Sequence, residues 1–192
     1  MAAAAADGGG GRGDGRGRTV RVTFISRRPY NAAGVDHSGF LGRQVSNEDA
    51  LLGALTAVAA PAPGVRVAVT RVDLALLPPT EQLALVADTD VLVGMHGAAL
   101  TFSLYMPPHG AVLELWPKPQ DMWRCFEHAA TMAGLQYERW ANADPANLRI
   151  DEAGDYLAVD AVTVAGMLGR VVKDVYGRVA ARRGGAGAGA AS

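Results

Sequence analysis

The chain has 192 residues, 49% of them hydrophobic, and a formal net charge of −1, which suits one globular domain with a buried core. This near-neutral charge argues against a nucleic-acid partner, because neutralising phosphates needs a basic excess or a basic face. Cys125 is the only cysteine, so the composition excludes an intrachain disulfide and a zinc site with four thiolate ligands.

Both ends of the chain are poor in residues that build a core. Residues 1–18 are Ala, Gly, Arg and Asp after the first Met, and residues 181–192 are mostly Gly and Ala. We expect two disordered tails around a domain at 19–180. The arginines of the first tail could also be read as a Gly-Arg RNA-binding tract, although a solvated tail is favoured. The sequence shows no targeting signal and no apolar run long enough for a membrane segment.

Strand-like and helix-like patterns alternate along the domain. Apolar and β-branched runs predict strands at 20–25, 65–72, 90–95, 111–116 and 136–140. Helical patterns predict helices at 47–60, 79–89, 97–106, 122–134 and 159–179. This alternation predicts a doubly wound α/β domain with a mostly parallel sheet covered on both faces.

Local signals mark several boundaries of these elements. Ser46 or Asn47 can cap the helix at 47–60, and Gly134 is suited to end the helix at 122–134. Residues 28–46 form the one long loop predicted within the sheet. Because such a loop is roughly twice the usual connection length, we expect it to serve a function.

Polar residues follow three of the predicted strands. Ser26 and Arg27 follow the first, His96 and Gly97 follow the third, and Glu114 lies near the end of the fourth. Ligands of open parallel sheets bind beyond the carboxyl ends of the strands, so these residues predict one binding edge.

The turn at His96 and Gly97 has the character of an anion site. A helix that begins at Gly97 and Ala98 offers free backbone N–H groups and the positive end of its dipole. His96 adds a titratable ring at the same point. Alternatively, His96 is a packed residue that satisfies a neighbouring carbonyl group.

Arginines and a carboxylate complete the candidate site. Arg27 and, from the long loop, Arg43 can bind phosphate oxygens, or they can be solvated loop charges. Glu114 can accept hydrogen bonds from two vicinal sugar hydroxyls, or it can pair with a nearby arginine.

Several common kinds of site have no support in the sequence. The remaining histidines lack metal-ligand spacing, and no Gly-x-Ser-x-Gly motif indicates a nucleophilic serine. After the first strand the chain has Ser-Arg-Arg-Pro in place of the Gly-x-Gly-x-x-Gly fingerprint, which argues against a nicotinamide cofactor. We therefore expect neither a metal nor a cofactor.

Four motifs carry a family resemblance: Phe-Ile-Ser-Arg at 24–27, Gly-Arg-x-Val-x-Asn-Glu at 42–48, Glu-Gln at 81–82, and Asp-Val-Leu-Val-Gly-Met-His-Gly-Ala-Ala-Leu-Thr at 90–101. With residues 102–114, they resemble the carboxyl-terminal half of glycosyltransferase family 61. That family includes plant xylosyl- and arabinosyltransferases and animal enzymes that add O-linked N-acetylglucosamine to proteins.

The resemblance implies a Rossmann-like domain, the donor-binding half of a GT-B arrangement, and an inverting transfer from a UDP-sugar to a glycan or protein-linked acceptor. The diphosphate would meet Ser26, Arg27 and Arg43 and the helix start at Gly97 and Ala98. Glu114 would face the ribose. His96 would be the catalytic residue, in contact with the phosphate or with the charge that develops near the donor sugar.

The length of the chain limits what kind of transferase it can be. Two domains of about 150 residues each would need more than this chain offers, so we expect a fragment without the acceptor domain or a stand-alone donor-binding domain. The general base is therefore left unassigned. A non-catalytic nucleotide-binding module, or a decayed transferase-like interaction domain, is the alternative. Placement in the Golgi or the lumen of the endoplasmic reticulum follows from the resemblance only.

Overall fold

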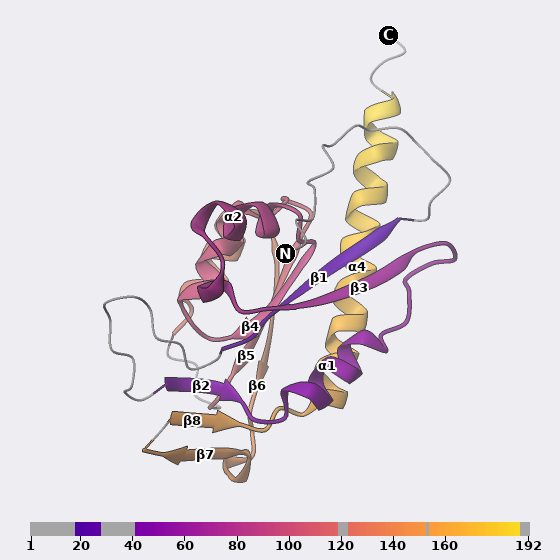
Figure 1. Cartoon of the computed structure of the whole chain (residues 1–192). Coiled ribbons are helices and arrows are strands. Elements are labelled where there is room, and N and C mark those ends of the chain that lie inside the picture. Colours follow the sequence, from indigo (N-terminus) through magenta and orange to yellow (C-terminus); the bar gives the residue numbers. More distant parts are fainter. Residues whose placement is uncertain (1–17, 28–40, 119–122, 153, 189–192) are drawn as a thin grey trace, which may run out of the picture.

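The computed structural model describes residues 18–27, 41–118, 123–152 and 154–188 (Figure 1). Its centre is a five-stranded, wholly parallel sheet in the order β3-β1-β4-β5-β6. The strands are β1 (Thr19–Ile25), β3 (Arg66–Val72), β4 (Val91–Met95), β5 (Ala111–Trp116) and β6 (Gln136–Ala141). The predicted α/β class and all five predicted strands are confirmed. Of the predicted tails at 1–18 and 181–192, residues 1–17 and 189–192 lie outside the described residues.

Helices cover both faces of this sheet. Helices α1 (Glu48–Thr56) and α4 (Ala161–Ala188) pack on one face. Helix α2 (Pro79–Ala87), the 3₁₀ helix η2 (Ala98–Tyr105) and helix α3 (Cys125–Met132) pack on the other, and Figure 1 shows α2 and α4 on opposite sides. Strands β4 and β5 are therefore buried along their whole length, which is why they consist of nearly unbroken apolar residues.

The strand order reverses between β1 and β4. From β1 the chain first crosses to β3 on one side, and then returns past β1 to form β4 on the other side. The connections after β1 and β4 consequently diverge and leave a crevice at the carboxyl ends of the strands. In open α/β sheets this switch point is where ligands bind.

A second, smaller sheet was not predicted. It has the order β2-β8-β7, formed by β2 (Leu41–Val45), β7 (Leu148–Asp151) and β8 (Gly154–Leu157). Strand β2 occupies the end of the segment predicted as a long loop, of which residues 28–40 lie outside the described part. These strands have four or five residues, and the pairing of β2 is irregular, so no periodic signal identifies them.

The ends of the helices agree only in part with the sequence signals. Gly134 adopts a φ of 72° next to Ala133, the C-cap of α3, and ends the helix as predicted. Asn47 is at the N-cap of α1 but makes no side-chain cap; its amide instead exchanges two 2.8 Å hydrogen bonds with the backbone of Val159. Helix α4 continues to Ala188, beyond the predicted tail start at 181.

No helix within the described ranges is both long enough and apolar enough to cross a lipid bilayer.

The 3₁₀ helices η1 (Leu74–Leu76) and η3 (Pro145–Asn147) follow β3 and β6, and each begins after an aspartate. Asp73 accepts a hydrogen bond from the backbone N–H of Ala75, and Asp144 accepts one from Ala146. These two short helices are thus capped in the same way.

Candidate functional site

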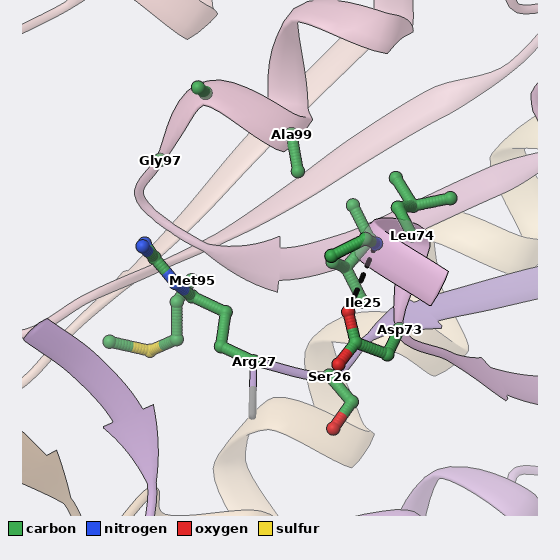
Figure 2. Close-up of a pocket in the computed structure, with 10 residues that line it drawn as sticks. Ile25, Ser26, Arg27, Asp73, Leu74, Met95, Gly97 and Ala99 are labelled. Carbon is green, nitrogen blue, oxygen red and sulfur yellow. Dashed lines mark hydrogen bonds between the residues drawn. The ribbon is translucent and has the colours of Figure 1, made fainter. Parts of the chain in front are cut away.

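The first candidate pocket lies at the switch point of the central sheet (Figure 2). It is an open hollow with a cavity volume of about 170 Å³. Its walls come from three neighbouring strand ends: Ser26 and Arg27 after β1, Asp73 after β3, and Gly97 and Ala98 after β4. The structure therefore brings together four of the residues that the sequence predicts for the diphosphate, namely Ser26, Arg27, Gly97 and Ala98.

Arg27 and Gly97 are in close approach. A Cβ atom added to Gly97 would lie 2.7 Å from Nη1 of Arg27, and Figure 2 shows the guanidinium directed toward this turn. Gly97 has an extended backbone, with a φ of 168°, so space rather than conformation favours glycine here. The first N–H groups of η2, which begins at Ala98, have no acceptor within the helix. A guanidinium and free backbone donors thus meet at one point, as an anion site requires.

Ser26 supports the pocket from beneath. Its side chain is buried, and its hydroxyl donates a 2.8 Å hydrogen bond to Oε2 of Glu48 on α1. The other oxygen of Glu48 accepts a 3.3 Å bond from Arg71. Ser26 therefore fixes the end of β1 against α1, while Ala98 is exposed at the mouth of the pocket.

A second pocket lies on the other side of the His96 turn. It is lined by Arg43 of β2, Asp155 of β8, His96 after β4, and Trp116, Pro117, Lys118 and Trp123 around the end of β5. Arg43 thus lines a different pocket from Arg27. It adopts a φ of 66° at the irregular pairing of β2, a conformation that costs a non-glycine residue roughly 1 kcal/mol or more and that clusters at functional sites.

His96 is held by a buried carboxylate. Its Nδ1 atom lies 2.5 Å from Oε1 of Glu114, and Glu114 is fully buried. The other oxygen of Glu114 accepts a hydrogen bond from the Tyr137 hydroxyl and lies 3.4 Å from Nε of Arg139. The structure therefore pairs Glu114 with an arginine, Arg139, which was one of the two alternatives that the sequence left open for Glu114. Both oxygens are engaged inside the protein, so neither is exposed to ribose hydroxyls.

The surroundings of His96 define its protonation. Burial is the largest effect and lowers the pKa of His96; the bond to Glu114 opposes this shift, and the charges of Arg43 and Arg139 add to it. The ring packs edge-on against Trp116 at 4.0 Å. A neutral ring that donates its Nδ1 proton to Glu114 has a lone pair on Nε2. We assign Nε2 as a hydrogen-bond acceptor on this basis.

Tyr137 behaves as a donor in the same network. Burial and the hydrogen bond to Glu114 raise the pKa of its hydroxyl, so the phenol keeps its proton at neutral pH. Its oxygen also accepts a 2.8 Å hydrogen bond from Nε of Arg139. Glu114 thus accepts hydrogen bonds from both His96 and Tyr137. This favours a neutral His96 that donates from Nδ1 and can accept at Nε2.

This arrangement predicts a pH-dependent stability. Because the pKa of folded His96 is lowered, the unfolded chain takes up a proton below its ordinary pKa of about 6.5 while the folded chain resists it. The free energy of unfolding should fall as the pH drops from 7.5 to 5.5, by at most about 1.4 kcal/mol per pH unit from this group. Urea titrations of the wild type and His96→Asn should show the smaller pH effect in the variant.

His128→Asn provides the matched control for this measurement, because His128 is exposed on α3. It should retain the pH effect of the wild type. Equal pH slopes for the wild type and His96→Asn would contradict the assignment.

Sequence reasoning missed the residues that hold His96. Tyr137 and Arg139 are two positions apart in β6 and share one face of the strand, which their alternation could have indicated. Their contact with Glu114 could not be predicted from the sequence, because it depends on the register that places Arg139 beside Glu114 in β5. Asp73, which lines the first pocket, was missed for lack of any motif.

No group of three or more metal-ligating side chains of the kinds His, Cys, Asp and Glu is found among the residues that the structure describes. The expectation of a site without a metal remains a prediction.

Parts of the chain are similar in sequence to known transferases. The chain is similar to the EGF domain-specific O-linked N-acetylglucosamine transferase of Drosophila melanogaster, with 35% identity over 125 residues, 65% of this chain and 20% of the relative. It is also similar to the transferases of the same name from Xenopus laevis, with 36% identity over 53% of this chain, and Mus musculus, with 34% over 51%; each match covers 18% of the relative. The chain thus spans about a fifth of the length of these relatives.

A flavodoxin-like domain from Synechococcus sp. is a structural neighbour, with 13% identity, a TM-score of 0.41, and coverage of 81% of this chain and 94% of that domain. This similarity is too low to carry a functional argument. The family comparison is decisive, since residues 16–113, just over half of the 192, match the family described as Glycosyltransferase 61. The chain therefore belongs to glycosyltransferase family 61.

Proposed function

We propose that this chain is the donor-binding half of an inverting glycosyltransferase with a GT-B arrangement. It would bind a UDP-sugar for transfer to a glycan or protein-linked acceptor. The observation that carries this proposal is the approach of the Arg27 guanidinium to the start of η2 across Gly97, at the switch point of the sheet. Family membership supports it, and the names of the similar transferases favour a protein acceptor with an EGF domain.

The chemistry of transfer fits such a cradle. As the bond to the donor sugar breaks, negative charge grows on the departing diphosphate. The Arg27 guanidinium lies beside Gly97, directly before the first N–H groups of η2, so these donors together would stabilise this charge. Removing one donor of this type from an enzyme typically costs about 100-fold or more in rate.

His96 would act next to the transferred sugar. It directly precedes Gly97 of the first pocket and lines the second pocket with Trp116. With Nδ1 bound to Glu114, the Nε2 acceptor is suited to a sugar hydroxyl better than to a phosphate oxygen, which carries no proton at neutral pH. Arg27 would therefore bind the diphosphate, and His96 would accept a hydrogen bond from a hydroxyl of the sugar or of the acceptor.

The remaining parts of the enzyme would come from residues that have no counterpart here. Because the chain spans about a fifth of the length of its relatives, we propose that a second domain supplies the acceptor site. The family also leads us to propose the lumen of the endoplasmic reticulum or Golgi as the place of action.

Calorimetric titration of the whole chain with UDP tests the proposal. We expect a dissociation constant below about 1 mM, equivalent to a binding free energy of about −4 kcal/mol. Uridine should bind more weakly, because it lacks the diphosphate that Arg27 and η2 would hold. Absence of binding at millimolar UDP would favour a decayed, transferase-like interaction domain, and equal affinity for uridine would contradict a diphosphate cradle.

A further inference from the structure

The carboxylate of Asp73 has an acceptor oxygen without a role in the fold. Asp73 follows β3 and lines the first pocket, where its Oδ1 atom accepts a 3.1 Å hydrogen bond from the N–H of Ala75 (Figure 2). Its Oδ2 atom is buried and has no hydrogen-bond partner among the described residues. Buried polar atoms in native proteins are nearly always paired, so an unpaired carboxylate oxygen in a pocket wall indicates a missing donor.

The position of Asp73 relates it to the proposed diphosphate site. Strand β3 neighbours β1 on the side away from β4, and both Val72 of β3 and Gly94 of β4 are in register with Ile25 of β1. Parallel strands are about 4.8 Å apart, so Asp73 and the Gly97 turn are separated by two spacings, or roughly 10 Å across the sheet. A ribose with its diphosphate extended over the strand ends can cover this span.

The two sides of the pocket offer opposite chemistry. Arg27 and the start of η2 present hydrogen-bond donors, which suit phosphate oxygens, whereas Asp73 presents an acceptor, which suits a hydroxyl. A purely anionic ligand such as pyrophosphate would gain nothing from Asp73 and would be repelled by its charge. The pocket therefore fits a ligand that carries an anion at one end and hydroxyls at the other.

We infer that Asp73 accepts a hydrogen bond from a ribose hydroxyl of the donor nucleotide. This inference rests on the proposed function and assigns to Asp73 the contact that the sequence suggested for Glu114, whose oxygens are both engaged by His96 and Tyr137. In dinucleotide-binding α/β folds an acidic side chain likewise binds the ribose. Because Oδ1 keeps the bond to the N–H of Ala75, Oδ2 is the oxygen that remains to accept from the ligand.

Deoxynucleotides provide a direct test with the whole chain. We expect the wild type to bind UDP about tenfold more tightly than 2′-deoxy-UDP or 3′-deoxy-UDP, whichever lacks the hydroxyl that Asp73 binds. In Asp73→Ala, UDP should bind about tenfold more weakly and the preference should disappear. Affinity for pyrophosphate should change less than twofold or increase, because the variant removes a negative charge.

Asp144→Ala is the matched control, because Asp144 caps η3 through Ala146 at 2.9 Å as Asp73 caps η1 through Ala75. The Asp144→Ala variant should bind UDP more tightly than the deoxy analogue to the same extent as the wild type. If Asp73→Ala fails to fold, Asp73→Asn preserves the size of the side chain and an oxygen for Ala75, and it should reduce the same preference.

The outcomes separate the two proposals. If UDP binds the wild type but the ratios for both deoxy analogues are unchanged in the Asp73 variants, the assignment of Asp73 is wrong and the donor site stands. If UDP does not bind the wild type, the proposed function and this inference both fail.

Discussion

Arg27→Ala is expected to weaken UDP binding between about 10- and 100-fold, the range that corresponds to losing charge-assisted hydrogen bonds of about 1.5–3 kcal/mol. The guanidinium is the cationic group beside the start of η2, so its removal leaves the diphosphate with backbone donors only. Calorimetry of the wild type and the variant measures this ratio directly. Thermal unfolding of both proteins would verify that the variant remains folded.

Arg21→Ala is a matched control for this loss. Arg21 lies on the same strand, β1, near its opposite end, where it is largely exposed and pairs with Asp88 at 3.0 Å. Its removal changes the net charge equally, but it should alter UDP affinity less than twofold. Equal effects of the two variants would show that net charge, and not the pocket, determines binding.

Glu114→Ala is expected to lower the free energy of unfolding by about 3 kcal/mol, the largest stability effect that we predict. The substitution leaves Nδ1 of His96 and the Tyr137 hydroxyl without their acceptor, and it removes the charge that pairs with Arg139. Because His96 is almost completely buried, water cannot replace the hydrogen bond that Nδ1 loses. Urea denaturation of the wild type and the variant measures the loss.

Glu138→Ala is the control for this second prediction. Glu138 lies between Tyr137 and Arg139 in β6, so its side chain points to the opposite face of the sheet. We expect a change of less than about 1 kcal/mol, as for most substitutions outside a buried network. A loss for Glu114→Ala no larger than that of Glu138→Ala would mean that the buried network contributes little.

The central sheet was predictable because its strands are buried on both faces. The runs that became β4 and β5 are almost free of polar residues, and the alternating helical segments left few arrangements other than a parallel sheet. The strand ends then indicated Ser26, Arg27, Gly97 and Ala98 as neighbours, which they are. This part of the site depends on the parallel, doubly wound class of the sheet, which the alternation of strands and helices predicted.

The rest of the site depends on interactions that the sequence pattern does not encode. The role of Glu114 follows from its register with Arg139 on β6, and parallel pairing between strands about twenty residues apart has no local signal. Arg43 is oriented by an irregular pairing in a five-residue strand. Asp73 stands in a short connection, where an aspartate is expected simply as a cap.

These residues divide the site into two parts. The first pocket combines Arg27, the start of η2 and Asp73, the set of donors and acceptor that we propose for the nucleotide. The second combines His96, Arg43 and Trp116, and its aromatic wall and acceptor nitrogen suit a sugar. His96 and Gly97 are adjacent in sequence, so one turn would connect the leaving diphosphate with the sugar that it leaves.

A crystal structure of the chain with UDP tests the central claim most directly. The account predicts that the diphosphate lies between the Arg27 guanidinium and the backbone N–H groups at the start of η2, with the ribose toward Asp73. UDP bound instead in the pocket of Arg43 and Trp116, or away from the carboxyl ends of β1 and β4, would contradict it.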